Sequence, residues 1–202
     1  MPPDNKWEYK RATKESARKG YDILMNGGTA VEAVEAAVRD LENNEYFNAG
    51  YGSLLNNDGE VECDAMIMEG HTLRYGAVIS GRHFKNPVSL SKIIMYESSH
   101  CALSGDGALQ FAQRKGFPKC DPGELISELA REKVKVSYED YLGYVKYYYG
   151  SKPLGKETHD TVSAVAMDTY GHLACAMSTG TCKSLLFGLQ NIYFQKLRNL
   201  II

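Results

Sequence analysis

Two apolar, β-prone runs, at residues 161–167 and 174–180, constrain the fold of this chain more than any other feature. The residues between them include Asp168-Thr169-Tyr170-Gly171, which have the composition of a hairpin turn. The sequence therefore predicts a β-hairpin. Its first strand opens at Thr161, directly behind a polar connector that contains lysines.

Thr161 has two interpretations at this position. A β-branched residue that opens a strand is ordinary strand composition. A threonine hydroxyl can also serve as a nucleophile when a base lies within hydrogen-bond reach, and cutting the preceding peptide bond would make the residue's own α-amine that base. A free α-amine has a pKa of roughly 7.7–8.0, which suits a general base at neutral pH. The residue types and their spacing leave both interpretations open.

The first forty residues predict two helices. Residues 6–26 have an apolar face with basic side chains outside it, and Gly27-Gly28 ends that helix. Thr29 opens the second helix with Glu32 three residues later, which is a capping box. Apolar residues then recur at helical spacing, so helix, glycine turn and helix form an αα-hairpin. These apolar residues are Val31, Val34, Ala37, Val38 and Leu41.

An asparagine- and glycine-rich loop spans residues 41–53, where side chains can bond the nearby backbone and carbonyl groups can turn inward. Residues 51–55 and 60–67 have strand composition, and Asn57-Asp58-Gly59 between them is a hairpin signal. The Asn-Asp-Gly-Glu string lacks the ligand spacing of a calcium loop, so it is interpreted as a turn. Residues 73–80 predict a further short strand.

The middle of the chain predicts mainly helices. Asn86-Pro87 is an N-cap followed by proline at the first helical position, and the helix runs to about Tyr96. Residues 150–157 form a link without apolar periodicity. Further helices are predicted at about 106–115, 123–134 and 137–148.

The composition excludes several classes of partner. Among 202 residues the formal net charge is −2 and 44% are hydrophobic, which suits one domain with a substantial core. This net charge does not indicate a basic surface that would bind nucleic acid, and no apolar run approaches the length of a membrane span. The opening residues lack the apolar segment of a secretory signal. Five scattered cysteines have no zinc or redox spacing, so a cytoplasmic protein with reduced thiols is expected.

Several motifs follow one another between Tyr9 and Gly180. They are Gly27-Gly28-Thr29-Ala30-Val31-Glu32-Ala33-Val34, Phe47-Asn48-Ala49-Gly50, Asp64-Ala65 with Ile67-Met68, Gly76-Ala77-Val78, Asn86-Pro87, His100, Asp160-Thr161-Val162 and Ser178-Thr179-Gly180. Motifs this long, in this order, resemble the asparaginase-like branch of the N-terminal nucleophile hydrolases. That branch includes the plant-type L-asparaginases and the isoaspartyl peptidases.

The resemblance implies an α+β fold, the αββα sandwich of N-terminal nucleophile hydrolases. It also implies that the chain cuts itself between Asp160 and Thr161, by attack of the threonine on the Asp160 carbonyl. The freed Thr161 would then be the nucleophile that hydrolyses β-aspartyl amide bonds. Thr179 maps to the family's threonine beside the nucleophile, and Asn48 maps to a loop asparagine that supports the same centre. Each also has a plain structural interpretation, since Asn48 can cap its own loop and Thr179 can be an ordinary strand residue.

The resemblance implies that residues 1–202 form one domain. Residues 1–160 would correspond to the family's α-subunit and residues 161–202 to the start of its β-subunit, with a tail that diverges from the family from residue 181 onward. It implies no cofactor other than a structural sodium ion, held mainly by backbone carbonyls. The small-molecule substrate would be asparagine or a β-aspartyl dipeptide, and a homodimer is expected by analogy. The sodium loop maps to Leu41, Glu42, Asn44, Phe47, Ala49 and Tyr51.

Both ends of the chain depart from the family pattern. The family begins with a strand and a His-Gly-Gly-Ala-Gly loop, whereas this chain starts at its first helix. After Gly180 the family has residues that bind the substrate and donate to the oxyanion, and none is identifiable in 181–202. Loss of one oxyanion donor costs roughly 10²–10³ in rate in a well-studied hydrolase. We therefore expect a truncated or alternatively spliced form with little or no asparaginase activity; the alternative to an active hydrolase is a catalytically silent partner of another subunit.

Overall fold

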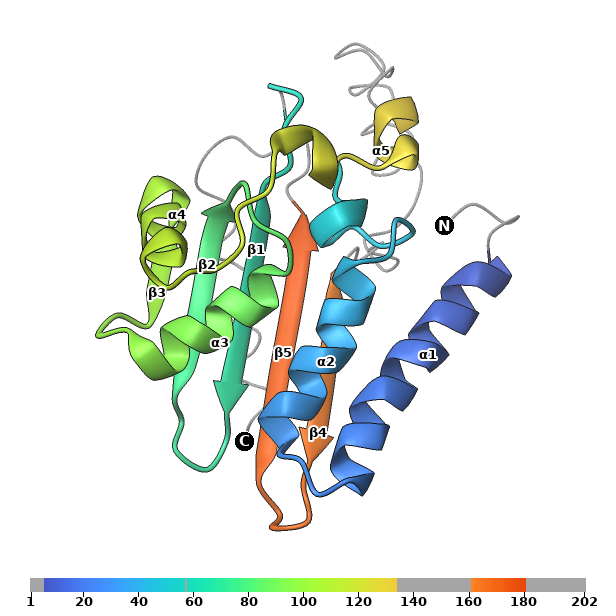
Figure 1. Cartoon of the computed structure of the whole chain (residues 1–202). Coiled ribbons are helices and arrows are strands. Elements are labelled where there is room, and N and C mark those ends of the chain that lie inside the picture. Colours follow the sequence, from blue (N-terminus) through green and yellow to red (C-terminus); the bar gives the residue numbers. More distant parts are fainter. Residues whose placement is uncertain (1–5, 57, 134–160, 181–202) are drawn as a thin grey trace, which may run out of the picture.

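The computed structural model describes residues 6–56, 58–133 and 161–180 (Figure 1). Its strands are β1 (Cys63–Glu69), β2 (Tyr75–Gly81), β3 (Ala102–Ser104), β4 (Val162–Met167) and β5 (Leu173–Gly180). They form one sheet in the order β3-β2-β1-β5-β4. β1 is antiparallel to both β2 and β5, and β4 is antiparallel to β5, whereas β2 and β3 run parallel. The mixed α+β fold expected from the sequence is confirmed.

Helices cover one face of this sheet (Figure 1). α2 (Ala30–Glu42) packs on β4 and β5, and α3 (Pro87–Glu97) packs on β1 and β2. α1 (Lys6–Met25) lies against α2, and α4 (Gly105–Arg114) lies against β2 and β3. The remaining elements are η2 (Gly50–Gly52), η3 (Pro122–Leu125) and α5 (Glu128–Lys133). No helix within the described residues is long and apolar enough to cross a membrane.

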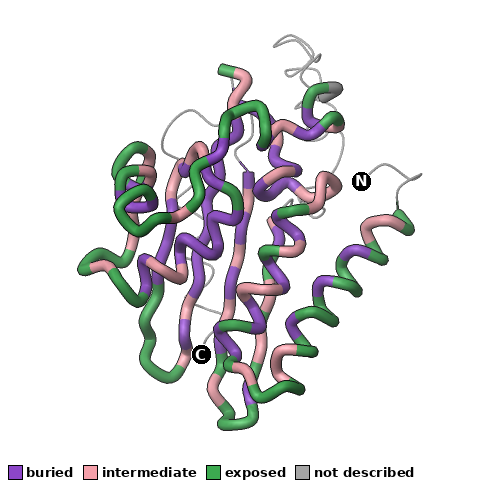
Figure 2. The backbone as a smooth tube through the Cα atoms, in the orientation of Figure 1, coloured by how far each residue is buried: buried purple, intermediate pink, exposed green. Residues whose placement is uncertain are grey.

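The local sequence explains why α2 forms and which face it buries. Thr29 Oγ1 accepts a hydrogen bond from the Glu32 N–H at 3.2 Å, and Glu32 Oε2 accepts one from the Thr29 N–H at 2.8 Å. The predicted capping box is therefore confirmed. The buried face of α2 meets the sheet and α3 in the main core, where each fully buried aliphatic side chain contributes about 1.5–3 kcal/mol (Figure 2). Among the core residues are Val34, Val38, Ile67, Val88, Ala174 and Ala176.

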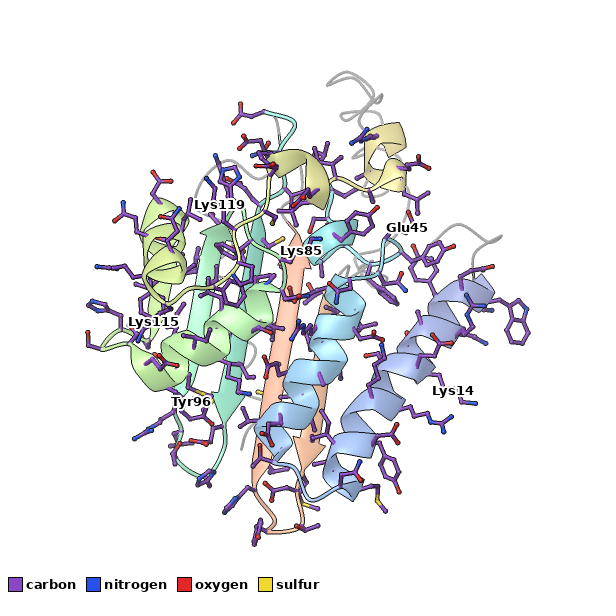
Figure 3. The ribbon with its side chains drawn as sticks, in the orientation of Figure 1. Lys14, Glu45, Lys85, Tyr96, Lys115 and Lys119 are labelled. Carbon is purple, nitrogen blue, oxygen red and sulfur yellow. The ribbon has the colours of Figure 1, made fainter. Side chains whose placement is uncertain are left out.

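α1 packs on α2 through small side chains. Its buried residues are Ala12, Ser16 and Gly20, four apart along the helix, so they form one narrow stripe. Ser16 Oγ donates a hydrogen bond to the Ala37 carbonyl at 2.6 Å, and a Cβ at Gly20 would lie 2.9 Å from the Ala33 carbonyl oxygen. Most other α1 side chains lie in solvent, as Lys14 does (Figure 3).

The predicted hairpin at 161–180 is confirmed as β4 and β5, and Asp168 organises its turn. Asp168 Oδ1 accepts hydrogen bonds from the N–H groups of Tyr170 and His172, both at 3.0 Å. Its Oδ2 accepts one from the Ala30 N–H at 3.3 Å, which joins the turn to the first turn of α2. Burial would raise the pKa of Asp168, but these three N–H groups lower it below its ordinary value.

One strand prediction and one helix prediction are wrong in part. Residues 51–55 do not form a strand, because η2 occupies 50–52 and only a single bridge joins Leu55 to Val61. Gly50 has φ of +55° and packs so closely on the end of α2 that a Cβ there would lie 2.8 Å from Glu42 Cβ. The helix predicted at 123–134 is reduced to α5, and the one predicted at 137–148 lies outside the described residues.

Asn86 precedes α3 as predicted, but it does not cap the helix with its side chain. Its backbone is left-handed, with φ of 54°, which is uncommon for a residue with a side chain. Its Nδ2 instead donates to Asn43 Oδ1 at 3.0 Å and to Glu42 Oε2 at 3.3 Å. Contacts with the end of α2 therefore replace the local capping bond that the sequence favoured.

Candidate active site at the end of the central strands

The predicted threonines lie opposite one another at one end of the hairpin. Val162 pairs with Ser178 in the antiparallel β4–β5 ladder, so the preceding Thr161 faces the following Thr179. Residues directly opposite in such a ladder point to the same face, with Cβ atoms roughly 4.5–5.5 Å apart. Both threonines are half-buried. The fold therefore brings the two predicted hydroxyl groups into neighbouring positions.

These threonines lie on the face of the sheet that points away from α2 and α3. Val162 and Ala176 belong to the core under the helices. Side chains alternate between the two faces along a strand, so Thr161 and Thr179 belong to the opposite face. No described helix covers that face (Figure 1). Within the described residues, the two threonines therefore lie on a face that has no helix layer.

Asn48 reaches the same end of the sheet from the loop after α2. Its Nδ2 donates a hydrogen bond to the Gly180 carbonyl at 3.2 Å, and the Gly180 N–H donates to the Asn48 carbonyl at 2.7 Å. Its Oδ1 accepts from the Leu54 N–H at 2.9 Å, so Asn48 also braces its own loop. A Cβ at Gly180 would overlap Asn48 Oδ1 and lie 2.5 Å from Ser53 Oγ, so this close approach requires glycine. Asn48 is thus fixed one residue away from Thr179.

Glu42, at the end of α2, is a buried carboxyl group whose side-chain contacts the sequence did not reveal. The side chain is fully buried at the end of α2. Glu42 Oε1 accepts from the Val88 N–H at 3.0 Å, and Oε2 accepts from Asn86 Nδ2 at 3.3 Å. Burial raises the pKa of Glu42 to about 7, although these donors oppose the rise. The carboxyl group therefore joins α2 to the start of α3 and changes charge near neutral pH.

Glu42→Gln should flatten the dependence of stability on pH. Because the folded-state pKa lies above the ordinary value of 4.5, the contribution of Glu42 is fully present below about pH 4.5 and is lost as pH rises through about 7. The parent should lose on the order of 1 to 3 kcal/mol of unfolding free energy from this group between pH 5 and 8, and the variant should not. Urea unfolding at several pH values measures this slope.

The readout is the slope of the unfolding free energy against pH, rather than the absolute stability. The NH₂ group of the glutamine would face one of the two donors, the Val88 N–H or Asn86 Nδ2, so the variant also loses a hydrogen bond that does not depend on pH. Glu45→Gln, in the loop after α2, is the matched control and should keep the parent's slope (Figure 3). Equal slopes for the parent and Glu42→Gln would contradict the assignment. Asp64, whose pKa burial raises to about 6, should preserve part of the slope in every variant.

The predicted sodium loop has carbonyl oxygens that point inward. A Cβ at Gly52 would overlap the Phe47 carbonyl oxygen and lie 2.6 Å from that of Asn44. The Phe47 carbonyl also accepts from the Ala49 N–H at 2.8 Å, which leaves its second lone pair for another partner. Within the described residues no group of three or more His, Cys, Asp or Glu side chains is arranged to hold a metal ion. The oxygens present at this loop are the type that a hard cation prefers, so the loop fits such an ion.

Not every predicted site residue can be located. Asp160, the residue before the predicted cut, lies outside the described residues, as does the tail from 181. Leu41 and Glu42 lie at the end of α2, and Tyr51 lies within η2. Asp64, which the sequence connected with no role, pairs with Thr179 across β1 and β5. The end of the sheet therefore carries a row of three polar residues rather than two.

The chain matches a protein-family model described as Asparaginase over residues 1–188. It is 42% identical over 180 residues to isoaspartyl peptidase/L-asparaginase of Danio rerio, a match covering 89% of this chain and 56% of that protein. It is 40% identical over 185 residues to the Homo sapiens protein of the same name, covering 92% of this chain and 58% of that protein. The Rattus norvegicus protein of that name is 41% identical over 189 residues, a match covering 93% of this chain and 54% of that protein. The chain thus spans little more than half the length of these relatives.

Proposed function

Because this chain belongs to the asparaginase family, we propose that it is a threonine-dependent amidohydrolase that cuts itself before Thr161. It would then hydrolyse the β-aspartyl amide bonds of asparagine or isoaspartyl dipeptides. The observation that carries the proposal is the pairing of Thr161 with Thr179 across the β4–β5 ladder, at the end of the sheet that Asn48 reaches through its hydrogen bonds to Gly180. Thr161 directly precedes β4, Thr179 lies in β5, and Asn48 comes from the loop after α2.

The self-cleavage step uses the Thr161 hydroxyl and the Asp160 carbonyl. Thr161 Oγ1 would attack the carbonyl carbon, and the Asp160–Thr161 C–N bond would break as the acyl group moves to the oxygen. The departing nitrogen takes up the hydroxyl proton and becomes the free α-amine of Thr161. Water then hydrolyses the ester, which leaves a carboxylate on Asp160 and restores the hydroxyl. The product has the nucleophile and its base in one residue.

The hydrolytic step repeats this chemistry on the substrate. The Thr161 amine would accept the proton of Oγ1 as the oxygen attacks the β-carbonyl carbon, and the same proton would pass to the leaving amine. Ammonia leaves from asparagine, and an amino acid leaves from an isoaspartyl dipeptide. Water completes the cycle by hydrolysing the β-aspartyl ester. Thr179 and Asn48 would orient the reacting groups through their hydroxyl and amide dipoles.

The finer features of the family fold and its bound ion are part of this proposal. The described residues supply a helix layer and one sheet, and Val165, Met167 and Leu173 are exposed on or near its uncovered face. Apolar side chains gathered there support a second sheet and helix layer, because large exposed apolar patches are normally covered. The inward carbonyls around Gly52 support a structural sodium ion that braces the loop holding Asn48. The two-part division at 160 and 161, pairing into a homodimer and a cytoplasmic location remain predictions.

Intact-mass spectrometry of the expressed chain tests the proposal. We expect two fragments, one ending at Asp160 and one starting at Thr161, to accumulate over hours to days. The cleaved protein should then release aspartate from an isoaspartyl dipeptide or from asparagine. A chain that stays whole and turns over neither substrate would contradict the proposal and favour the catalytically silent alternative.

A further inference from the structure

We propose that Asp64 is a positioning residue of this site, whose carboxylate accepts a hydrogen bond from the Thr179 hydroxyl and so fixes that hydroxyl beside Thr161. The inference deepens the proposed function and names a third polar group that serves the threonine pair. It depends on strand register, on a bulge in β1–β2 and on the burial of the carboxyl group.

Strand register places Asp64 in the row of the two threonines. Asp64 pairs with Thr179 in the β1–β5 ladder, and Thr179 faces Thr161 in the continuation of the β4–β5 ladder. Ala65 and Ile67, the next residues of β1 on the other face, belong to the core under the helices. Asp64 therefore shares the uncovered face with both threonines, next to Thr179.

A bulge between β1 and β2 directs the Asp64 side chain. Cys63 pairs with Gly81 and Ala65 pairs with Val78, so β2 has an extra residue opposite Asp64. Ser80 lies at this irregularity with φ of +50°, a conformation that costs energy for a residue other than glycine. Its N–H donates to Asp64 Oδ1 at 2.7 Å, in place of a ladder bond. One carboxyl oxygen is thus fixed by β2, which leaves the other for the row of threonines.

The Thr179 hydroxyl is not held by a strong hydrogen bond to another acceptor among the described residues. Within the described residues its recorded hydrogen bond runs to the Gly180 carbonyl at 3.4 Å, which is longer than a normal O–H···O bond. A hydroxyl held so weakly can rotate toward a stronger acceptor. An ionised carboxylate is the strongest acceptor available across the ladder, because charge-assisted bonds are about twice as strong as neutral ones.

The surroundings of Asp64 set the pH range of this contact. Asp64 is 7% exposed, and burial raises the pKa of its carboxyl group to about 6, with the Ser80 N–H opposing the rise and the Glu62 charge adding to it. Glu62 is itself paired with Arg82, whose Nε donates to it at 2.6 Å. On the β5 side the titratable residue of this face is Cys175, near the far end of the strand. The carboxylate would therefore be ionised, and able to accept from Thr179, above about pH 6.

Asp64→Asn separates positioning from a merely structural role. The asparagine keeps an oxygen for the Ser80 N–H, so the bulge should persist and the variant should still fold. Its NH₂ group cannot accept from the Thr179 hydroxyl. We expect self-cleavage to slow by about 10- to 100-fold at pH 8, the usual range for losing a hydrogen bond to a charged group. The parent is expected to lose cleavage rate below about pH 6, and this loss should disappear in the variant. Asp58→Asn, at an exposed turn position, is the control and should change neither rate nor pH profile.

A double-mutant cycle tests the contact without relying on catalysis. Asp64→Asn and Thr179→Val, alone and combined, should show a coupling of about 5- to 10-fold in the unfolding equilibrium constant at pH 8, and little coupling at pH 5. No coupling at pH 8, with an unchanged cleavage rate in Asp64→Asn, would overturn the inference while leaving the proposed function intact. Coupling in a chain that never cuts itself would support the contact and reject the proposed function.

Discussion

Thr161→Ala should leave the chain whole under conditions in which the parent separates into two fragments. The alanine has no oxygen to attack the Asp160 carbonyl, and Thr179 and Asn48 cannot replace it, because neither directly follows the bond to be cut. Removing a catalytic nucleophile typically costs more than about 10⁴-fold in rate. Neither fragment should therefore reach the detection limit of an intact-mass spectrum over the time in which the parent reacts completely.

Two substitutions control for this result. Thr169→Ala makes the same chemical change at an exposed residue of the hairpin turn and should leave cleavage at the parent rate. Thr161→Ser keeps the hydroxyl and should restore both fragments. Cleavage of Thr161→Ala at a rate near the parent's would show that another residue or a contaminating protease cuts the chain. That outcome would remove Thr161 from the proposed mechanism.

Gly76→Ala should destabilise the fold by about 3 kcal/mol, at the upper end of the cost of overpacking. Gly76 faces α3 from β2, and a Cβ there would overlap the Ser91 carbonyl oxygen and lie 2.5 Å from the Met95 backbone nitrogen. The obstruction is helix backbone rather than the movable end of a side chain. The helix would have to move away from the sheet, which would also disturb the bond from Ser91 Oγ to the Ala65 carbonyl, now 3.1 Å.

Gly107→Ala provides the matched comparison. Gly107 lies in α4, exposed to solvent, with nothing within 4 Å of the position that a Cβ would occupy. Alanine should stabilise this helix by roughly 0.5–1 kcal/mol because it loses less backbone entropy on folding. Urea unfolding of both variants would measure the difference. Similar stabilities for the two variants would mean that α3 does not approach β2 as closely as described.

The sequence correctly predicted the elements that are specified by residues close together in the chain. The capping box of Thr29 and Glu32 and the turn composition at 168–171 each specify their structure through residues two to four apart. The strand predicted at 51–55 and the side-chain cap of Asn86 failed for the opposite reason. Both segments lie against the end of α2, and contacts there with Glu42 and Asn43 outweigh the local preference.

The sequence also predicted only part of the candidate site, the part that does not depend on contacts between distant segments. Resemblance to a family identified Thr161, Thr179 and Asn48, and the predicted hairpin already places Thr161 beside Thr179. The position of Asp64 beside Thr179 depends instead on β5 lying between β1 and β4. No pattern of neighbouring residues specifies that order. Asp64 and Glu42 received no side-chain role from the sequence, because a buried carboxyl group is recognised only when its donors, the N–H groups of Ser80 and Val88, have been located.

The position of β5 also determines what would become of the protein after scission. Fragment 161–202 would carry β4 and β5, while β1 would remain on fragment 1–160. Seven residue pairs join β1 to β5, so the two polypeptides would sediment as one particle and separate only in denaturant. Reassembly would then be bimolecular and dependent on concentration, whereas the uncut precursor refolds as a single molecule.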